Sequence, residues 1–247
     1  MVDTHAHLDD PAFDADRAAV MQRAAAAGVR GVMVPAIEAS AWPRLRALSA
    51  EHGWRFAIGT HPHALVRSRA LPDDLRGASA VGECGLDGGV PVPMEDQEAV
   101  LLGHLAAAHD SGLPILLHCW RAHHRLPALL RRFGAVRGIL HSYSGGAELV
   151  DVYVKLGLHL SFAGAVTREA ARRPVEALRR VPRERLLAET DAPDQCPSPL
   201  RGRSEPAMLP LVVRAMERLR GEPLLDALHA NAEALGFRFP AVEPHDA

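Results

Sequence analysis

Residue types that bind divalent metal ions stand at the ends of short apolar runs throughout this chain of 247 residues. The first run closes on His5-Ala6-His7, near the N-terminus. Residues two positions apart on a β-strand point to the same side, so both imidazoles could bind one ion. Alone, the pair would also be compatible with two unrelated polar residues. Five further runs of the same form close on His61, Glu83, His118, His141 and Asp191.

The two carboxylates favour the metal interpretation because each of them ends an apolar segment. Glu83 lies within AVGECGLD, and Asp191 follows RLLAET. A buried, unpaired carboxylate is costly, so a cation or an arginine must neutralise each one. A structural salt bridge would meet the same demand. His118 and His141 end two later runs, where neutral imidazoles could bind a second ion.

The elements that must position these residues alternate between strands and helices along the chain. Apolar runs of strand length are separated by segments in which apolar residues recur at helical spacing. Strands are expected at residues 2–7, 31–37, 54–60, 78–84, 114–119, 136–142, 158–164 and 185–191. Helices are expected at residues 15–28, 39–52, 72–77, 95–112, 123–134, 146–157, 167–181, 206–220 and 223–235.

Eight apolar strands separated by helices predict an α/β fold with a parallel sheet covered by helices. A closed (β/α)8 TIM barrel is favoured over an open doubly wound sheet, because the metal-binding residue types follow six different strands. In a barrel the C-terminal ends of all strands open onto one face, where these residues would form one metal site. No linker or repeat marks a boundary, so residues 1–247 are expected to form a single domain.

Composition excludes several classes of protein. The 28 basic and 30 acidic residues give a formal net charge of -2, which does not by itself indicate nucleic-acid binding. No apolar run reaches the roughly 18 to 20 residues that cross a bilayer, and no leader fits before His5, so we expect a cytoplasmic protein without membrane contact. Cys84, Cys119 and Cys196 lack CxxC spacing and are interpreted as reduced packing residues. A monomer is expected.

Six segments together resemble a known family. DTHAHLD, GTHPH, GECGLD, LHC, HSYSG and ETDAP are similar in order and interval to the signature segments of the TatD-type metal-dependent deoxyribonucleases, and the similarity covers residue 3 to about residue 235. That family belongs to the amidohydrolase-like superfamily of metallo-dependent hydrolases, which have TIM-barrel folds. The resemblance implies two ions, the first bound by His5, His7 and Asp191 and the second by His118 and His141, with Glu83 bridging them.

The resemblance also implies roles in catalysis. His61 would contact the substrate phosphate rather than a metal, and Asp191 would accept the proton of the attacking water. Glu83 would join the two ions. We expect Mg2+ or Mn2+ in the working enzyme, with Zn2+ as an alternative occupant of the purified protein, because imidazoles are good zinc ligands.

Substrate contacts are expected near the segments that differ from the family pattern. Trp120 stands where the family commonly has arginine, and Arg121 follows it; the tryptophan could stack on a base or pack against the next helix. Arg203, in RSEP, is expected to contact phosphate or to form a structural ion pair. Gly88 and Gly89 replace an aromatic residue that often follows GECGLD, which predicts a more flexible loop.

Several other basic residues lie close to these segments in the sequence. His63, His123 and His124 could line the mouth of the barrel, although a histidine near a surface loop is usually only solvated. Paired arginines on predicted helices are expected to face water and are poor candidates for substrate binding. These pairs are Arg131-Arg132, Arg172-Arg173 and Arg179-Arg180.

Three functions are compatible with these expectations. The first is hydrolysis of DNA phosphodiesters by a 3′-5′ exonuclease or a single-strand-preferring nuclease, because a barrel mouth admits an unstacked end more easily than a duplex. The second is hydrolysis of a small phosphoester, lactone or amide at the same two-ion site, since fold and metals do not determine the substrate. The least favoured is a metal-binding protein without catalysis.

Overall fold

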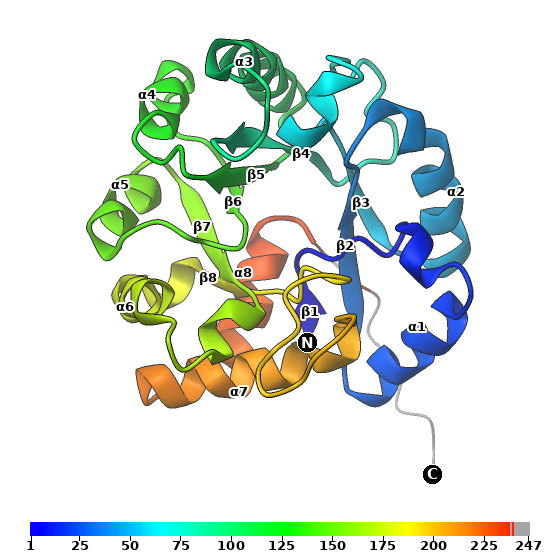
Figure 1. Ribbon diagram of the computed structural model, residues 1–247, viewed down its shortest axis with the longest axis vertical. Helices are drawn as coiled ribbons and strands as arrows, with labels where there is room; N and C mark the ends of the chain where they lie inside the picture. Colours follow the sequence, from blue (N-terminus) through cyan, green and yellow to red (C-terminus); the bar gives the residue numbers. More distant parts are fainter. Residues whose placement is uncertain (238, 240–247) are drawn as a thin grey trace.

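Residues 1–237 and 239 are described in the computed structural model of the protein. Parallel strands follow one another in chain order, each hydrogen-bonded to the next, and helices surround them (Figure 1). The predicted (β/α)8 barrel is confirmed. The strands are β1 (Val2–Asp3), β2 (Gly31–Pro35), β3 (Arg55–Ile58), β4 (Ala80–Asp87), β5 (Ile115–Trp120), β6 (Gly138–Leu140), β7 (Leu158–Phe162) and β8 (Leu186–Ala188).

Hydrogen bonds between the segments after β1 and β8 close the barrel. The amide of Asp191 donates to the carbonyl of His5 at 2.9 Å, and the amide of His7 donates to the carbonyl of Ala192 at 2.7 Å. Two predicted metal-binding segments that are far apart in the sequence therefore lie side by side.

Helices alternate with the strands, and most of them pack around the outside of the barrel (Figure 1). Within the described residues, no helix is long and apolar enough to cross a membrane. The α-helices are α1 (Arg17–Ala26), α2 (Trp42–His52), α3 (Met94–Ser111), α4 (Leu126–Leu130), α5 (Val150–Lys155), α6 (Arg172–Arg180), α7 (Leu209–Arg220) and α8 (Leu225–Ala234). The 3-10 turns are η1 (Pro11–Phe13), η2 (Ala39–Ala41), η3 (Pro62–Val66), η4 (Arg131–Phe133), η5 (Ala147–Leu149), η6 (Gly164–Thr167), η7 (Arg183–Arg185) and η8 (Pro206–Met208).

The expected helix at 72–77 is wrong. This segment is irregular, and the helical turn between β3 and β4 is η3 instead. The carbonyls of Asp74 and Arg76 accept hydrogen bonds from the Arg46 guanidinium on α2 rather than from helical amides. The side chain of Asp74 also accepts from the Arg76 amide, a local turn that competes with helix formation.

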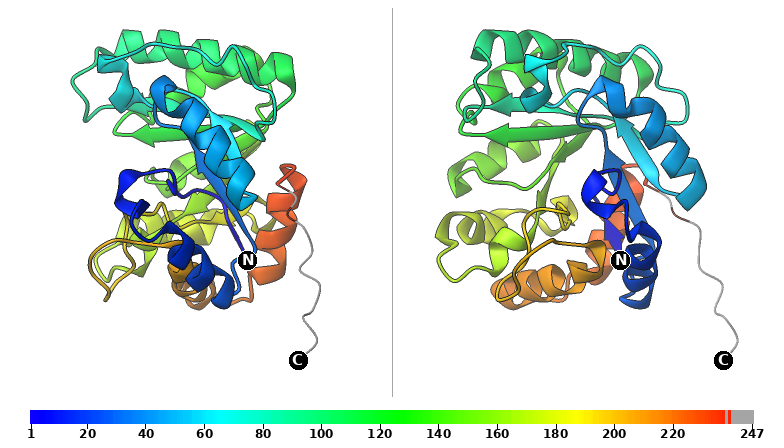
Figure 2. Two further views of the ribbon diagram at one scale, coloured as in Figure 1. Left: turned by 90° about the vertical axis from the view of Figure 1, so that its right-hand side faces the viewer. Right: turned by 45° about the vertical axis from the view of Figure 1, so that its right-hand side comes forward.

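A small apolar cluster fills the end of the barrel opposite the predicted site. It combines inward-facing strand residues such as Met33, Leu116 and Ile139 with Leu235 and Phe237, which follow α8. Figure 2 shows α8 against the end where the N-terminus lies. Because this end is filled, a ligand can approach the barrel axis only from the C-terminal ends of the strands. Residues 238 and 240–247 of the predicted domain lie outside the described residues.

Candidate metal centre and the adjoining cavity

Two glycines in β4 bring Glu83 into the interior of the barrel. A Cβ on Gly82 would lie 2.6 Å from the carbonyl oxygen of Leu116, and a Cβ on Gly85 would lie 1.9 Å from that of His118. Both glycines have positive φ angles, 141° and 152°, which other residues rarely adopt. β4 can therefore pack closely on β5 with Glu83 only 1% exposed.

Four imidazole nitrogens surround the two oxygens of the Glu83 carboxylate. Oε2 lies 3.1 Å from His5 Nε2 and 3.6 Å from His7 Nε2. Oε1 lies 2.9 Å from His141 Nε2 and 3.3 Å from His118 Nδ1. Each oxygen thus faces a different pair of the predicted ligand histidines, an arrangement suited to a carboxylate that bridges two cations. Oε1 also has Nε2 of His61 at 3.5 Å.

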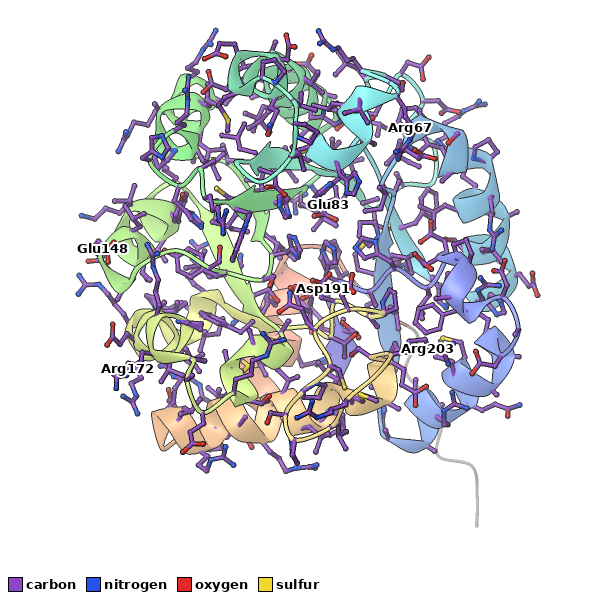
Figure 3. All side chains as sticks on the ribbon, in the orientation of Figure 1. Arg67, Glu83, Glu148, Arg172, Asp191 and Arg203 are labelled. Atoms are coloured by element: carbon purple, nitrogen blue, oxygen red, sulfur yellow. The ribbon has the colours of Figure 1, made fainter. Side chains whose placement is uncertain are left out.

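Asp191 adds a second carboxylate to the first pair of histidines. Its Oδ1 lies 3.7 Å from His5 Nε2 and 3.6 Å from His7 Nε2. Figure 3 shows Asp191 and Glu83 together near the centre of the barrel. The two imidazole nitrogens are only 3.2 Å apart, and Glu83 Oε2 is buried without a hydrogen-bond partner among the described residues. These converging nitrogen and oxygen donors fit a divalent ion such as Mg2+, Mn2+ or Zn2+.

The charge of Glu83 suits the role of a carboxylate that bridges two cations. Burial by itself would raise the pKa of the carboxyl, but the charges of His141, His5 and His61 bring it well below its usual range. The carboxylate is therefore ionised, as a metal ligand must be.

Two carboxylates that were not singled out from the sequence orient the second pair of histidines. Nε2 of His118 lies 3.1 Å from Oδ2 of Asp87, and Nδ1 of His141 lies 3.3 Å from Oε1 of Glu189. A carboxylate that accepts from one ring nitrogen leaves the lone pair of the other for a metal. Asp87 and Glu189 lie inside the quoted segments GECGLD and ETDAP, and that proximity is the signal that could have revealed them.

Asp3 connects the segments that follow β1 and β8. Its fully buried carboxyl accepts from the amide of Thr190 at 3.0 Å and from the Thr190 hydroxyl at 2.6 Å. Burial raises the pKa of Asp3 to about 7, although the hydrogen bonds from Thr190 oppose this shift. Asp3 therefore fixes the relative position of His5 and Asp191.

The tautomer of His61 differs from the one that a ligand needs to bind a metal through Nε2. Its Nδ1 accepts a hydrogen bond from the amide of His63 at 3.1 Å, so the ring proton of the neutral imidazole is on Nε2. That nitrogen lies 3.5 Å from Glu83 Oε1 and faces the site as a donor. Burial lowers the pKa of His61 to about 3, which keeps the ring neutral. The geometry suits a contact with a substrate oxygen.

Asp191 and three other residues of this site have strained backbones. The side chain of Gln195 donates to Asp191 Oδ2 at 2.6 Å and to the hydroxyl of Ser142. Four non-glycine residues among those described have positive φ angles: Asp191 (55°), Gln195 (49°), Ser142 (41°) and Arg121 (53°). Such conformations cost about 1–3 kcal/mol each and cluster at functional sites. All four residues line the same cavity.

This cavity has a volume of about 1140 Å³ and extends from the metal-binding cluster towards η5, η6 and α6. Its wall includes His118, His141 and Asp191 at the cluster, and Trp120 and Arg121 at the end of β5. Of the paired arginines that were expected to face water on the outer ring, Arg173 is exposed and also lies in the cavity wall, because α6 begins beside the mouth. Other basic wall residues are Arg168, His123 and His124.

The two glycines after GECGLD lie beside Trp120 and Arg121. A Cβ on Gly89 would lie 3.5 Å from Trp120 Cδ1, and a Cβ on Gly88 would lie 3.1 Å from that of Arg121. The loop that was expected to be flexible is hydrogen-bonded, with the Gly88 amide donating to the Trp120 carbonyl at 2.8 Å and the Gly89 amide to Asp87 Oδ1 at 2.7 Å. Trp120 is 44% exposed and so is not a packed core residue.

Two predicted substrate contacts lie apart from the cavity wall. Arg203 pairs with Asp16 at 2.6 Å and lies 4.6 Å from the Phe13 ring centroid. Of its two expected roles, the structure supports the ion pair rather than the phosphate contact, because the guanidinium is already neutralised. The side chain of His63 is exposed, and its amide positions His61.

Comparisons with known proteins agree with this geometry. The sequence profile of the TatD related DNase family matches residues 2–235. The chain is 34% identical over 235 residues to the "uncharacterized metal-dependent hydrolase YjjV" of Escherichia coli (strain K12), covering 90% of this chain and 91% of the relative. It is 34% identical over 256 residues to the "3'-5' ssDNA/RNA exonuclease TatD" of Rahnella sp. (strain Y9602), covering 93% and 95%.

A solved structure extends the similarity to three dimensions. The crystal structure of YjjV, a TatD homolog from Escherichia coli K12, superposes with a TM-score of 0.89 at 32% identity and covers 95% of this chain and 97% of that one. A TatD family hydrolase from Entamoeba histolytica shares the fold with a TM-score of 0.82 at 17% identity. The chain therefore belongs to the TatD-related DNase family of metal-dependent hydrolases.

Proposed function

We propose that this protein hydrolyses phosphodiester bonds of single-stranded DNA, acting from the 3′ end. The observation that carries the proposal is the Glu83 carboxylate, whose two oxygens each face a separate pair of histidines in the closed barrel. Relatives named as 3'-5' ssDNA/RNA exonucleases support this choice of substrate.

Two divalent ions would be held by residues that the structure brings together. His5, His7 and Asp191 would hold the first, His118 and His141 the second, and Glu83 would bridge them. When bound, such ions lower the pKa of water and neutralise charge on a phosphate. Mg2+ or Mn2+ would serve in the cell, and the imidazole-rich donor set would also accept Zn2+.

The protein's own groups then have separate tasks. Asp191 accepts the proton of the attacking water through Oδ1, because Gln195 already donates to Oδ2. Nε2–H of His61 donates to a non-bridging phosphate oxygen and stabilises its charge as the water attacks. The phosphorus gains the hydroxyl oxygen of water, and the bond to the leaving oxygen breaks in line. The leaving oxygen takes a proton from solvent, and Asp191 returns to solvent the proton that it accepted.

A second candidate activity is hydrolysis of a small phosphoester, lactone or amide at the same site. The net charge of -2 favours it, since the chain as a whole has no excess of positive charge for a polyanion.

One experiment separates the two candidates. Metal-loaded protein is incubated with single-stranded DNA labelled at either end, beside a chromogenic phosphodiester and a lactone, with Asp191→Ala as the control. Release of mononucleotides from the 3′ end by the intact protein alone supports the proposal. Hydrolysis of the lactone without any cleavage of DNA would refute it.

A further inference from the structure

The cavity beside the metal-binding cluster is larger than one nucleotide requires. Its volume of about 1140 Å³ exceeds the roughly 300–1,000 Å³ of most small-molecule sites. The cluster occupies one end, and the other end is formed by η5, η6 and the start of α6. This cavity gives a polymer that reaches the cluster a route along which its further nucleotides can lie.

Three arginines line the cavity, and we call them the arginine rim: Arg121, Arg168 and Arg173. Within the described residues, none of the three guanidinium groups has a hydrogen bond or an ion pair. The guanidinium of Arg121 lies 5.7 Å from the centroid of the Trp120 ring. Free guanidinium groups can form forked bonds to phosphate oxygens without first giving up a carboxylate.

Tyr143, Glu148 and Arg173 all lie in the wall of this cavity. Burial raises the pKa of Tyr143, the charge of Glu148 adds to the rise, and the charge of Arg173 opposes it. Arg173 and Glu148 therefore lie near the same buried ring. The arginine rim shares the cavity wall with two carboxylates, Glu148 and, at the metal-binding cluster, Asp191, so arginines outnumber carboxylates in this wall.

We propose that the arginine rim binds backbone phosphates of the nucleotides that adjoin the scissile bond, with Trp120 stacking on a base. This inference rests on the proposed nuclease function and extends it, because it makes the enzyme favour chains of several nucleotides over small diesters. Base stacking on an exposed tryptophan and arginine contacts to phosphate are the usual pair of interactions in single-strand binding.

The test compares substrates of different size. Arg168→Gln and Arg173→Gln are each measured with a single-stranded oligonucleotide of about ten residues, as DNA and as RNA, and with bis(p-nitrophenyl) phosphate. Arg172→Gln is the matched control, since Arg172 is the neighbour of Arg173 on α6 but is absent from the cavity wall, and Figure 3 shows it at the outer side of that helix.

The rim variants should lower the ratio of kcat/KM for the oligonucleotide to kcat/KM for the small diester by about 10-fold or more, through KM. The Arg172→Gln protein should keep the wild-type ratio. Glu148→Gln should move KM for the oligonucleotide in the opposite direction. The slope of log KM against log salt should also fall by about 0.7 for each phosphate contact removed.

The possible failures are distinguishable. Equal losses on both substrates, or no difference between Arg173→Gln and Arg172→Gln, would overturn the role of the rim while leaving the nuclease function intact. If the wild-type protein cleaves neither substrate, the proposed function fails, and fluorescence anisotropy of a labelled oligonucleotide then tests the rim separately. Weaker binding by Arg168→Gln and Arg173→Gln but not by Arg172→Gln supports the role of the rim, and equal binding by all variants overturns it.

Discussion

The buried histidine of α3 provides a quantitative test of how the loop that carries His61 is held. His104 is 0% exposed; its Nε2 accepts from the amide of Thr60 at 3.0 Å, and its Nδ1 lies 2.9 Å from the carbonyl of Val100. Thr60 precedes His61. Protonation of Nε2 would remove the acceptor that anchors this loop, so the neutral ring is required in the folded state.

The pKa shift of His104 determines how much stability the protein loses as the pH falls, and in which pH range. Burial lowers its pKa from 6.5 to about 4, with a weaker opposing contribution from the Val100 hydrogen bond. The folded state therefore binds fewer protons than the unfolded state between these values, so stability is complete above the unfolded pKa and is lost as pH falls towards the folded one. A shift of roughly 2.5 units corresponds to about 3 kcal/mol in full, of which about 2 kcal/mol is lost by roughly pH 5.

The assay is chemical denaturation of the metal-free protein at about pH 7.5 and about pH 5. His104→Gln carries an acceptor that does not titrate, so the variant should gain about 2 kcal/mol relative to wild type between the two pH values. His109→Gln, an exposed position on the same helix, is the control and should follow wild type. Parallel pH dependence of His104→Gln and wild type would refute the reasoning.

The other predictions concern the metal centre and its supports. Metal analysis of protein prepared without chelator should find close to two divalent ions per chain, and fewer than one would contradict the two-ion site; Glu83→Ala should lower this number and abolish hydrolysis. Asp191→Asn should still bind single-stranded DNA, measured by anisotropy, but lose turnover at saturating metal, and full turnover would exclude it as the base. Gln195→Ala should lower kcat about 10- to 100-fold with little change in melting temperature, because it removes the donor that orients Asp191. Gly85→Ala should unfold or destabilise the protein by more than about 3 kcal/mol in denaturation experiments, because its Cβ would lie 1.9 Å from a backbone oxygen.

Local sequence patterns were sufficient to predict the barrel and the residue types at its mouth. The alternation of apolar runs and helical segments is a property of neighbouring residues, and it identified the eight strands. The segment 72–77 shows where this reasoning fails, since the competing hydrogen bonds come from Arg46 on another helix. The ends of the strands also differ by a few residues from the predicted ends, because the hydrogen bonds between neighbouring strands determine where each strand ends.

Sequence alone determined that His5, His7, Glu83, His118, His141 and Asp191 lie on or just after five strands of one fold, because periodicity and motif order are carried by the chain itself. Only the tertiary structure decided which atoms meet: that Glu189 supports His141, that Arg203 is neutralised by Asp16, and that Arg173 faces the cavity. The physical reason is that charge pairing, tautomer and burial depend on partners far apart in the sequence. A strand's residue composition predicts that it is buried, but only the packing of neighbouring elements determines what its polar residues contact.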